Sequence, residues 1–213
     1  MANAPQLLKR LGTTIMPARN DPHPDLQIDQ IVNTFNKYGV EYVVVGGVGA
    51  MLHGAKKETL DFDAVVNMAN DNIERLVRAL DELGAYMRVS GAPDYEIKGL
   101  TFNKKWFVTS QNVTNWRTPV GDIDIMCEMP DAADHGNDYH TLMTNADKQK
   151  IRSLQVWVAG LDDIIASKKF ADRPKDQEAL PELQRLAQIE KGVSQKKATP
   201  PMQRKTNRPP LER

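Results

Sequence analysis

Apolar residues recur along the first half of the chain with two different periods, which predict alternating helices and strands. A helical period over residues 25–38, closed by Gly39, predicts a first helix, and a similar period predicts another over residues 70–83. The β-branched run at residues 42–45 is typical of a buried strand. Residues 48–53, which follow a pair of glycines, predict a short helix between this strand and the next.

Two further segments, residues 60–66 and 122–126, alternate apolar and acidic residues, and both predict strands. Successive side chains on a strand point to opposite faces. Asp61 and Asp63 therefore share one face of the first strand, and Asp122 and Asp124 share one face of the second.

The rest of the chain changes from strands to helices. Residues 86–119 fit irregular β-hairpins, with residues 106–108 the most strand-like piece, and residues 129–153 fit loop and helix. The last predicted elements are a strand at residues 154–158 and helices at residues 161–171 and 175–189.

This order predicts an α/β fold of the α+β kind, with a mixed sheet, helices on one side of it and a helical C-terminal segment. We expect four parts along the chain. They are an irregular arm over residues 1–24, a core over 25–130, a mainly helical part over 131–192 and a basic, irregular tail over 193–213.

Composition narrows the class of protein. Of the 213 residues, 40% are hydrophobic and 26% charged, which is ordinary for a soluble globular protein. The sequence has no apolar run of membrane-spanning length and no secretory signal. The single cysteine, Cys127, excludes an internal disulfide framework and fits a reducing cytoplasm. Its apolar surroundings predict a buried, unreactive thiol.

Charge is spread unevenly, although the 28 basic and 28 acidic residues cancel. Residues 1–192 hold 22 basic and 27 acidic side chains, so the body lacks the charge of a general nucleic-acid binder. The tail beyond residue 192 is basic and rich in proline. Such a composition fits a solvated end, and it could also grip phosphates without regard to sequence.

The paired acids point to a metal site. Carboxylates on one strand face raise each other's pKa, and a divalent cation removes that conflict. Mg²⁺ prefers oxygen ligands and keeps positions for water and substrate phosphates. Either Asp122 or Asp124 could add the further carboxylate that a two-metal site requires beside Asp61 and Asp63. For one pair taken alone, a solvated acidic strand face is an equal alternative.

A second feature, Gly46-Gly47, follows a buried strand and precedes a helix, where backbone N–H groups can approach a phosphate closely. A plain tight turn is the alternative. Thr59, two residues before Asp61, could hydrogen-bond a phosphate.

Taken in order, these motifs resemble the signature of the polymerase-β-like nucleotidyltransferases. The residues that carry the resemblance are Gly46-Gly47, Ala50, His53-Gly54, Thr59 and Asp61-Phe62-Asp63. Within that superfamily the pattern is most similar to the abortive-infection (AbiEii-like) nucleotidyltransferase toxins of bacterial toxin–antitoxin systems. Residues 118–125, 161–168 and 173–176 are similar to later motifs of that group, so the resemblance spans about residues 28–187.

The resemblance implies a polymerase-β-like core and Mg²⁺ or Mn²⁺ as cofactor. It also implies transfer of a nucleoside monophosphate from a nucleoside triphosphate to an acceptor hydroxyl, with release of pyrophosphate. Asp61, Asp63 and Asp124 would bind metal, and Asp124 would also act as general base. Asp124 is preferred to Asp122 because apolar residues continue its strand as they do in the family pattern.

The remaining roles concern the triphosphate. Backbone at Gly46 and Gly47 would cradle phosphates and Lys168 would neutralise their charge, although a solvated helical lysine is an equal alternative for Lys168. Lys57 stands where many relatives carry Arg, and a lysine meets a phosphate only as a point charge. The motifs also predict that Lys57, Thr59 and Lys175 bind the nucleotide. Arg173, Lys175 and Asp176 could extend the site or form an ion pair at a helix start, and we favour the ion pair for Arg173. His53 is interpreted as buried and structural.

The acceptor is left open by the residues. The resemblance points to tRNA 3′ ends, with a cognate antitoxin protein as a partner. An antibiotic and a protein hydroxyl are alternative acceptors. A non-catalytic nucleotide-binding module is an alternative function, which is disfavoured because such a module does not need three carboxylates in one site. Basic residues that could hold tRNA are Lys56-Lys57, Lys104-Lys105, Lys168-Lys169, Arg173, Lys175 and the tail.

Overall fold

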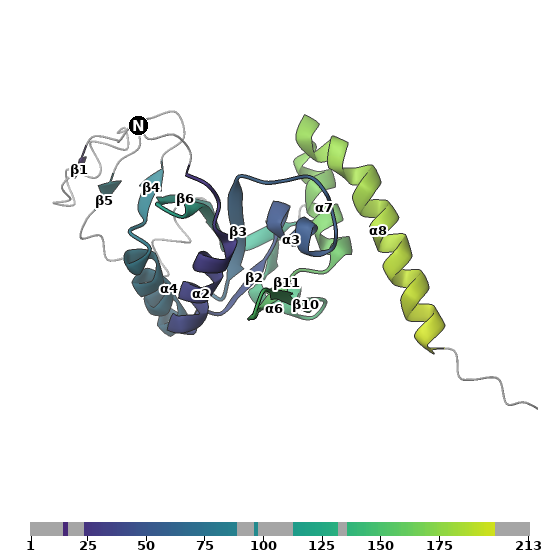
Figure 1. Cartoon of the computed structure of the whole chain (residues 1–213), viewed down its shortest axis with the longest axis horizontal. Helices are drawn as coiled ribbons and strands as arrows, with labels where there is room; N and C mark the ends of the chain where they lie inside the picture. Colours follow the sequence, from purple (N-terminus) through teal and green to yellow (C-terminus); the bar gives the residue numbers. More distant parts are fainter. Residues whose placement is uncertain (1–14, 17–23, 89–95, 98–112, 132–135, 199–213) are drawn as a thin grey trace, which may run out of the picture.

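A mixed sheet of seven strands forms the centre of the computed structural model, which describes residues 15–16, 24–88, 96–97, 113–131 and 136–198 (Figure 1). Across the sheet the strands are β10 (Asp147–Ile151), β11 (Leu154–Val158), β2 (Tyr42–Val44), β3 (Asp61–Val66), β7 (Gly121–Met126), β6 (Val113–Thr118) and β4 (Tyr86–Arg88). The β11–β2 and β3–β7 pairs are parallel and the other four are antiparallel.

Helices α2 (Ile28–Tyr38) and α4 (Asn70–Glu82) pack together and cover one face of the sheet. Their apolar stripes meet the inward side chains of β2, β3 and β7. Phe35 of α2 contacts Tyr42 and Phe62 edge-on, with ring centroids 5.1 and 6.1 Å apart. Such contacts add specific aromatic geometry to the burial of large apolar surfaces, and they fix α2 over the centre of the sheet.

The opposite face of the sheet is covered by α3 (Gly46–Leu52), α7 (Leu161–Ala171) and α8 (Pro174–Ala198). Val43 and Val65 face this second core, whereas Val44 and Ala64 face the first, as strand alternation requires. Asp61 and Asp63 share the face of Val65 and therefore lie beneath the C-terminal helices. The predicted mixed sheet with a helical C-terminal segment is confirmed. The expectation of helices on one side of the sheet is wrong, because α3 and the C-terminal helices cover the face opposite α2 and α4.

Several predicted boundaries shift for identifiable reasons. The first helix begins at Ile28, not at residue 25, and the N–H of Gln27 donates to the carbonyl of Val120 at 2.9 Å. That bond holds the preceding segment against the turn between β6 and β7. The short helix α3 begins at Gly46, so the two glycines are its first residues and not a turn before it. Helix α7 has the predicted bounds.

The largest differences lie beyond residue 128, where the sequence predicted loop and helix. The structure has β8 (Glu128–Pro130) paired with β9 (Gly136–Asp138), the short helix α6 (Tyr139–Met143) and the edge strand β10. Strand β10 reads Asp-Lys-Gln-Lys-Ile, without apolar alternation. Charged side chains on an edge strand oppose pairing with other molecules, and they also hide the strand from a search for period-two hydrophobicity.

Helix α8 is longer than predicted. It continues past Pro181 to Ala198, so the segment predicted as an irregular tail begins as helix. The predicted strand-like piece at residues 106–108, most of the predicted N-terminal arm and residues 199–213 lie outside the described residues.

Three smaller observations complete the fold. Cys127 follows β7 and is half-buried, not fully buried as predicted, and burial raises the pKa of its thiol above the usual value. Among the described residues, no helix combines the length and apolar character needed to cross a bilayer. The remaining small sheet pairs β1 (Ile15–Met16) with β5 (Glu96–Ile97).

Candidate active site

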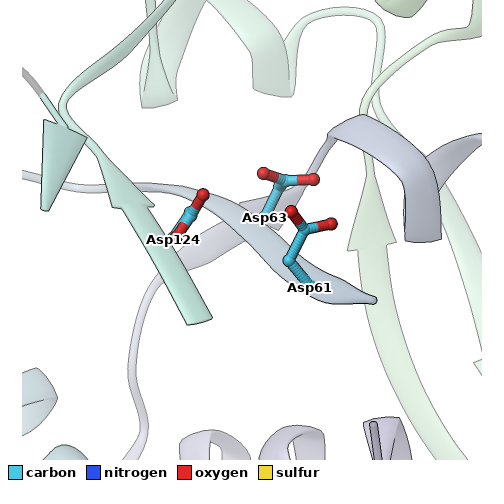
Figure 2. A group of neighbouring side chains, drawn as sticks. All are labelled: Asp61, Asp63 and Asp124. Carbon is cyan, nitrogen blue, oxygen red and sulfur yellow. The ribbon is translucent and has the colours of Figure 1, made fainter. Parts of the chain in front are cut away.

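Three of the predicted acids come together on the face of the sheet beneath α7 and α8. The parallel register of β3 and β7 places Asp63 beside Asp124 and Asp61 beside Asp122. One carboxylate oxygen from each of Asp61, Asp63 and Asp124 lies within 4.8 Å of the other two (Figure 2). The alternation seen in the sequence and this register together produce the cluster.

The electrostatics of the cluster favour a cation. Burial and then the nearby carboxylates of Asp61 and Asp124 raise the pKa of Asp63 to about 7. Burial also raises the pKa of Asp124, against a lowering hydrogen bond from Asn115. Carboxylate oxygens at this separation are the ligands that Mg²⁺ and Mn²⁺ prefer, and a divalent cation would relieve the repulsion. The residues therefore fit the divalent metal that the sequence predicted.

Asp122 and Asp124 occupy different environments, although they share a strand face. Asp122 is 2% exposed and accepts hydrogen bonds from Arg88 Nη1 at 2.7 Å and Arg117 Nε at 3.0 Å. Asp124 accepts from Asn115 Nδ2 at 2.7 Å, through Oδ1. The carboxylate of Asp122 is thus engaged by two guanidinium groups, and Asp124 is the one that joins the cluster. Asp124 as the third metal ligand therefore stays a prediction, and it has the geometry that this role requires.

Gly46 and Gly47 lie so close to neighbouring side chains that neither position has room for a Cβ atom. Gly46 has φ +58°, and a Cβ added there would lie 1.9 Å from Asp63 Oδ2. A Cβ at Gly47 would lie 2.4 Å from Thr59 Oγ1, and the N–H of Gly47 donates to Asp63 Oδ2 at 3.3 Å. The start of α3 therefore approaches β3 more closely than any side chain permits.

Replacing Gly46 with alanine is expected to reduce nucleotidyl transfer about a hundredfold, because an added methyl group must displace Asp63 and a small misplacement of a reacting group costs that much. The strained left-handed backbone adds a cost of about 1–2 kcal/mol to folding. Transfer rates and denaturant unfolding would measure both effects. Gly192→Ala is the matched control, because nothing lies within 4 Å of its added Cβ. Wild-type activity in Gly46→Ala would show that the close approach is unimportant.

A cavity of about 470 Å³ lies over the three acids, between the sheet and helices α7 and α8. A volume of this size is typical of small-molecule sites. Every residue that the sequence proposed for the site lines it: Gly46, Gly47, Lys57, Thr59, Asp61, Asp63, Asp124, Lys168 and Lys175. The structure thus brings together residues that are up to 129 positions apart in the chain.

Two of these residues have partners that the sequence did not suggest. The hydroxyl of Thr59 donates to Asp61 Oδ1 at 2.6 Å, so Thr59 orients a metal-site carboxylate. Lys57 Nζ donates to Glu178 Oε2 at 2.8 Å and to the carbonyl of Lys175 at 3.2 Å. Lys57 therefore joins the loop before β3 to the first turns of α8, while it still lines the cavity.

Asp176 holds two cations at the wall of the cavity. It is fully buried, and it accepts from Lys168 Nζ at 3.1 Å and from Arg173 Nε at 2.5 Å. Burial raises the pKa of Asp176, but these two hydrogen bonds outweigh it and leave the pKa below the usual value. The ion pair favoured for Arg173 is confirmed, and Asp176 also fixes Lys168 beside the site.

His53 and Asn115 complete the surroundings. His53 is buried as predicted, with Nε2 2.9 Å from the carbonyl of Ala159 and Nδ1 3.1 Å from Glu190 Oε1. It ties the end of α3 to the C-terminal segment and lies away from the acids. Asn115 was missed, because only the register of β6 against β7 shows that it lies opposite Asp124.

Comparisons with known proteins agree with this geometry. Residues 25–199 match the family described as nucleotidyltransferase of unknown function, DUF6036. No curated protein matches the chain. Among solved structures, the lincosamide antibiotic adenylyltransferase LnuA with lincomycin bound is 11% identical with a TM-score of 0.52, and the match covers 76% of this chain and 99% of that one.

ANT(2″)-Ia in complex with adenylyl-2″-tobramycin is 14% identical with a TM-score of 0.49, and the match covers 79% of this chain and 89% of that one. At such low identity the likeness to LnuA concerns the fold alone. The family match extends over most of the chain and includes every residue of the acid cluster. This chain belongs to the DUF6036 family of nucleotidyltransferases.

Proposed function

We propose that the protein transfers a nucleoside monophosphate from a nucleoside triphosphate to an acceptor hydroxyl, with the aid of Mg²⁺ or Mn²⁺. The observation that carries this proposal is the cluster of Asp61, Asp63 and Asp124 at the floor of a cavity that cationic side chains also line. Such a cavity offers metal ligands and phosphate partners in one place.

Asp61, Asp63 and Asp124 would hold the cation. When bound, a divalent cation neutralises phosphate charge and makes a coordinated hydroxyl easier to deprotonate. The hydrogen bonds of Thr59 to Asp61, Gly47 to Asp63 and Asn115 to Asp124 keep the three carboxylates oriented. Orientation of this kind fixes ligand geometry and tunes the site.

The other residues have roles that follow from their positions. Lys168 and Lys175 line the cavity and would offset the charge of the triphosphate, and Arg173 would add to them. In the reaction, the acceptor oxygen forms a bond to the α-phosphorus as the bond from that phosphorus to the bridging oxygen breaks. Pyrophosphate leaves, and Asp124 takes the proton of the acceptor hydroxyl.

For the acceptor we propose the 3′ end of a tRNA, in a toxin whose activity a cognate antitoxin restrains. The support is the resemblance of the motifs to the abortive-infection toxins. Lys57, Lys168, Arg173 and Lys175 line the cavity and would meet RNA phosphates there, in exchange for the contacts of Lys57 with Glu178 and of Lys168 and Arg173 with Asp176. Lys104 and Lys105 and the side chains of the tail lie outside the described residues.

A small antibiotic is the second candidate acceptor. The observation that favours it is the shared fold with LnuA, a lincosamide antibiotic adenylyltransferase whose full length this chain matches. The two candidates predict different salt dependence of nucleotidyl transfer. An RNA is bound through several phosphates, whereas a small antibiotic is not.

We expect total tRNA to be labelled when the protein is incubated with an α-labelled nucleoside triphosphate and Mg²⁺, and labelling to collapse between low and moderate salt. Each neutralised phosphate contributes about 0.7–0.9 to the slope of log affinity against log salt. Parallel incubations with lincosamides, aminoglycosides and cell lysate test drug and protein acceptors. If expression is harmless and no RNA is labelled at low salt with any of the four nucleotides, the tRNA acceptor is wrong.

A further inference from the structure

The side of the acid cluster that faces away from the glycine pair has a defined chemistry. Strand order places β2, which leads into α3, on one side of β3, and β7, β6 and β4 on the other. The triphosphate would lie on the first side, beside Gly46 and Gly47. The acceptor must then approach Asp124 from the side of β6 and β4, where Asn115 and Arg88 continue the row across the sheet.

This row is set by the strand register. Asp63 is paired with Asp124, Asp124 with Asn115, and Asn115 with Arg88, so all four side chains leave the same face. Neighbouring strands are about 4.8 Å apart, which puts the backbone of Arg88 about 10 Å from that of Asp124. A cation therefore stands two strands away from the base that receives the acceptor proton.

Arg88 retains capacity for an anion. Its side chain is 30% exposed, and it donates to Asp122 through Nη1 at 2.7 Å. The Nε group is buried and has no hydrogen-bond partner among the described residues. Asp122 also accepts a hydrogen bond from Arg117 Nε at 3.0 Å, so its carboxylate is not held by Arg88 alone.

The next row along the same face is apolar. Met126 follows Asp124 by two residues and is paired with Val113 of β6, and both line the cavity. Val113 is 39% exposed and Met126 is half-buried. A single exposed apolar side chain is ordinary, but these two lie next to each other and next to Asp124. Methionine adapts its shape to flat ligands and makes favourable contacts with aromatic rings.

We propose that Val113, Met126 and Arg88 form a subsite for the terminal nucleoside of an RNA acceptor. The base would lie on Val113 and Met126, the last phosphate would meet Arg88, and the free ribose hydroxyl would lie at Asp124. A nucleotide carries a planar base with apolar ring faces on one side of its ribose and an anionic phosphate on the other. These two groups match the apolar pair and the arginine of this surface. A polycationic drug offers neither group. This inference rests on the proposed nucleotidyl transfer.

Val113→Ser tests the base contact. The substrate is a short single-stranded RNA that ends in a free 3′ hydroxyl. We expect KM for this RNA to rise about fivefold to tenfold, the size expected for loss of one apolar contact. The value of kcat should not change. Phe170→Ser is the matched control, because Phe170 is also an exposed apolar residue but does not line the cavity. Its KM should equal that of the wild type.

Arg88→Gln tests the phosphate contact. The slope of log RNA affinity against log salt should become shallower by about 0.7, the contribution of one phosphate of a single strand, and Arg88→Lys should restore it. Arg78→Gln, at an exposed arginine of α4, is the control for loss of a charge elsewhere. Binding of a fluorescent nucleoside triphosphate, unchanged in both variants, shows that they remain folded.

Three outcomes separate the subsite from the proposed function. If the wild type labels RNA while Val113→Ser and Arg88→Gln keep its KM and salt slope, the subsite is wrong and the function stands. If the wild type binds a triphosphate but labels no acceptor, the proposed function itself fails. If a drug is labelled and RNA is not, the acceptor class is overturned. The shifts in KM and slope given above support the proposal.

Discussion

Asp61→Ala and Asp63→Ala are each expected to reduce nucleotidyl transfer by about a thousandfold or more, while the fold persists. The two carboxylates share one strand face and lie within 4.8 Å of each other and of Asp124. Removal of either carboxylate takes away a ligand to the cation that stabilises the charge of the reacting phosphate. Release of labelled pyrophosphate, or transfer of an α-labelled nucleotide, would measure the loss.

Stability provides an independent readout of the same site. The pKa of Asp63 is about 7 in the folded protein, against about 3.9 in an unfolded chain. The folded state therefore binds this proton more tightly, and without metal the free energy of unfolding should fall as pH rises from about 4 to about 7. Asp63→Asn should abolish that fall and be more stable than the parent at pH 8. Added Mn²⁺ should stabilise the parent more than the variant.

A matched substitution separates the cluster from acids in general. Asp162→Ala removes an exposed carboxylate of α7 that pairs only with Lys191 among the contacts of the described residues, and full activity is expected. Activity within tenfold of the wild type in both Asp61→Ala and Asp63→Ala would refute the metal-site assignment.

The strands that carry the site could be predicted because one pattern encodes both their structure and their chemistry. In β3 the alternation of apolar and acidic residues predicts a strand with a buried face and an acidic face, and the structure has both. The β-branched run of β2 was equally plain. The spacing of apolar residues along the chain was sufficient to predict these two strands, because each strand is buried on at least one face.

The parts that could not be predicted depend on contacts between distant segments. Strand β10 has no apolar period because it is an edge strand, and it exists through its antiparallel pairing with β11. The pairing of Asn115 with Asp124, and of Arg88 with Asp122, follows from strand register. Register across β4, β6 and β7 is a property of the assembled sheet, and a single sequence does not contain it in local form.

The helices that line the cavity could be predicted in part. The bounds of α7 follow from its apolar spacing, and Lys168 could be proposed from the motifs. Its orientation could not, because it is fixed by Asp176 from the next helix. Thr59 could be proposed from the motifs too, but its hydroxyl donates to Asp61 two residues further along the chain, a contact that the sequence did not suggest.

Asp124→Asn and Asp122→Asn, two substitutions of the same size on the same strand face, are expected to fail in different ways. Asp124→Asn should lose transfer by about a thousandfold, because an amide is a poor metal ligand and cannot take the proton of the acceptor. Its unfolding free energy should equal or exceed that of the parent, since the substitution removes charge from a repulsive cluster. Transfer assays and denaturant unfolding would measure the two quantities.

Asp122→Asn should instead destabilise the fold, by about 3–5 kcal/mol, because it removes the charge of a buried carboxylate that accepts hydrogen bonds from both Arg88 and Arg117. Below its melting temperature the variant should still transfer nucleotide, since Asp61, Asp63 and Asp124 remain. A double variant that replaces Arg88 and Asp122 by Gln and Asn should recover part of the stability, because the guanidinium of Arg88 is removed together with the carboxylate that it contacts. The reverse pattern, a stable and inactive Asp122→Asn beside an active Asp124→Asn, would move the third metal ligand to Asp122 and leave the rest of the site as described.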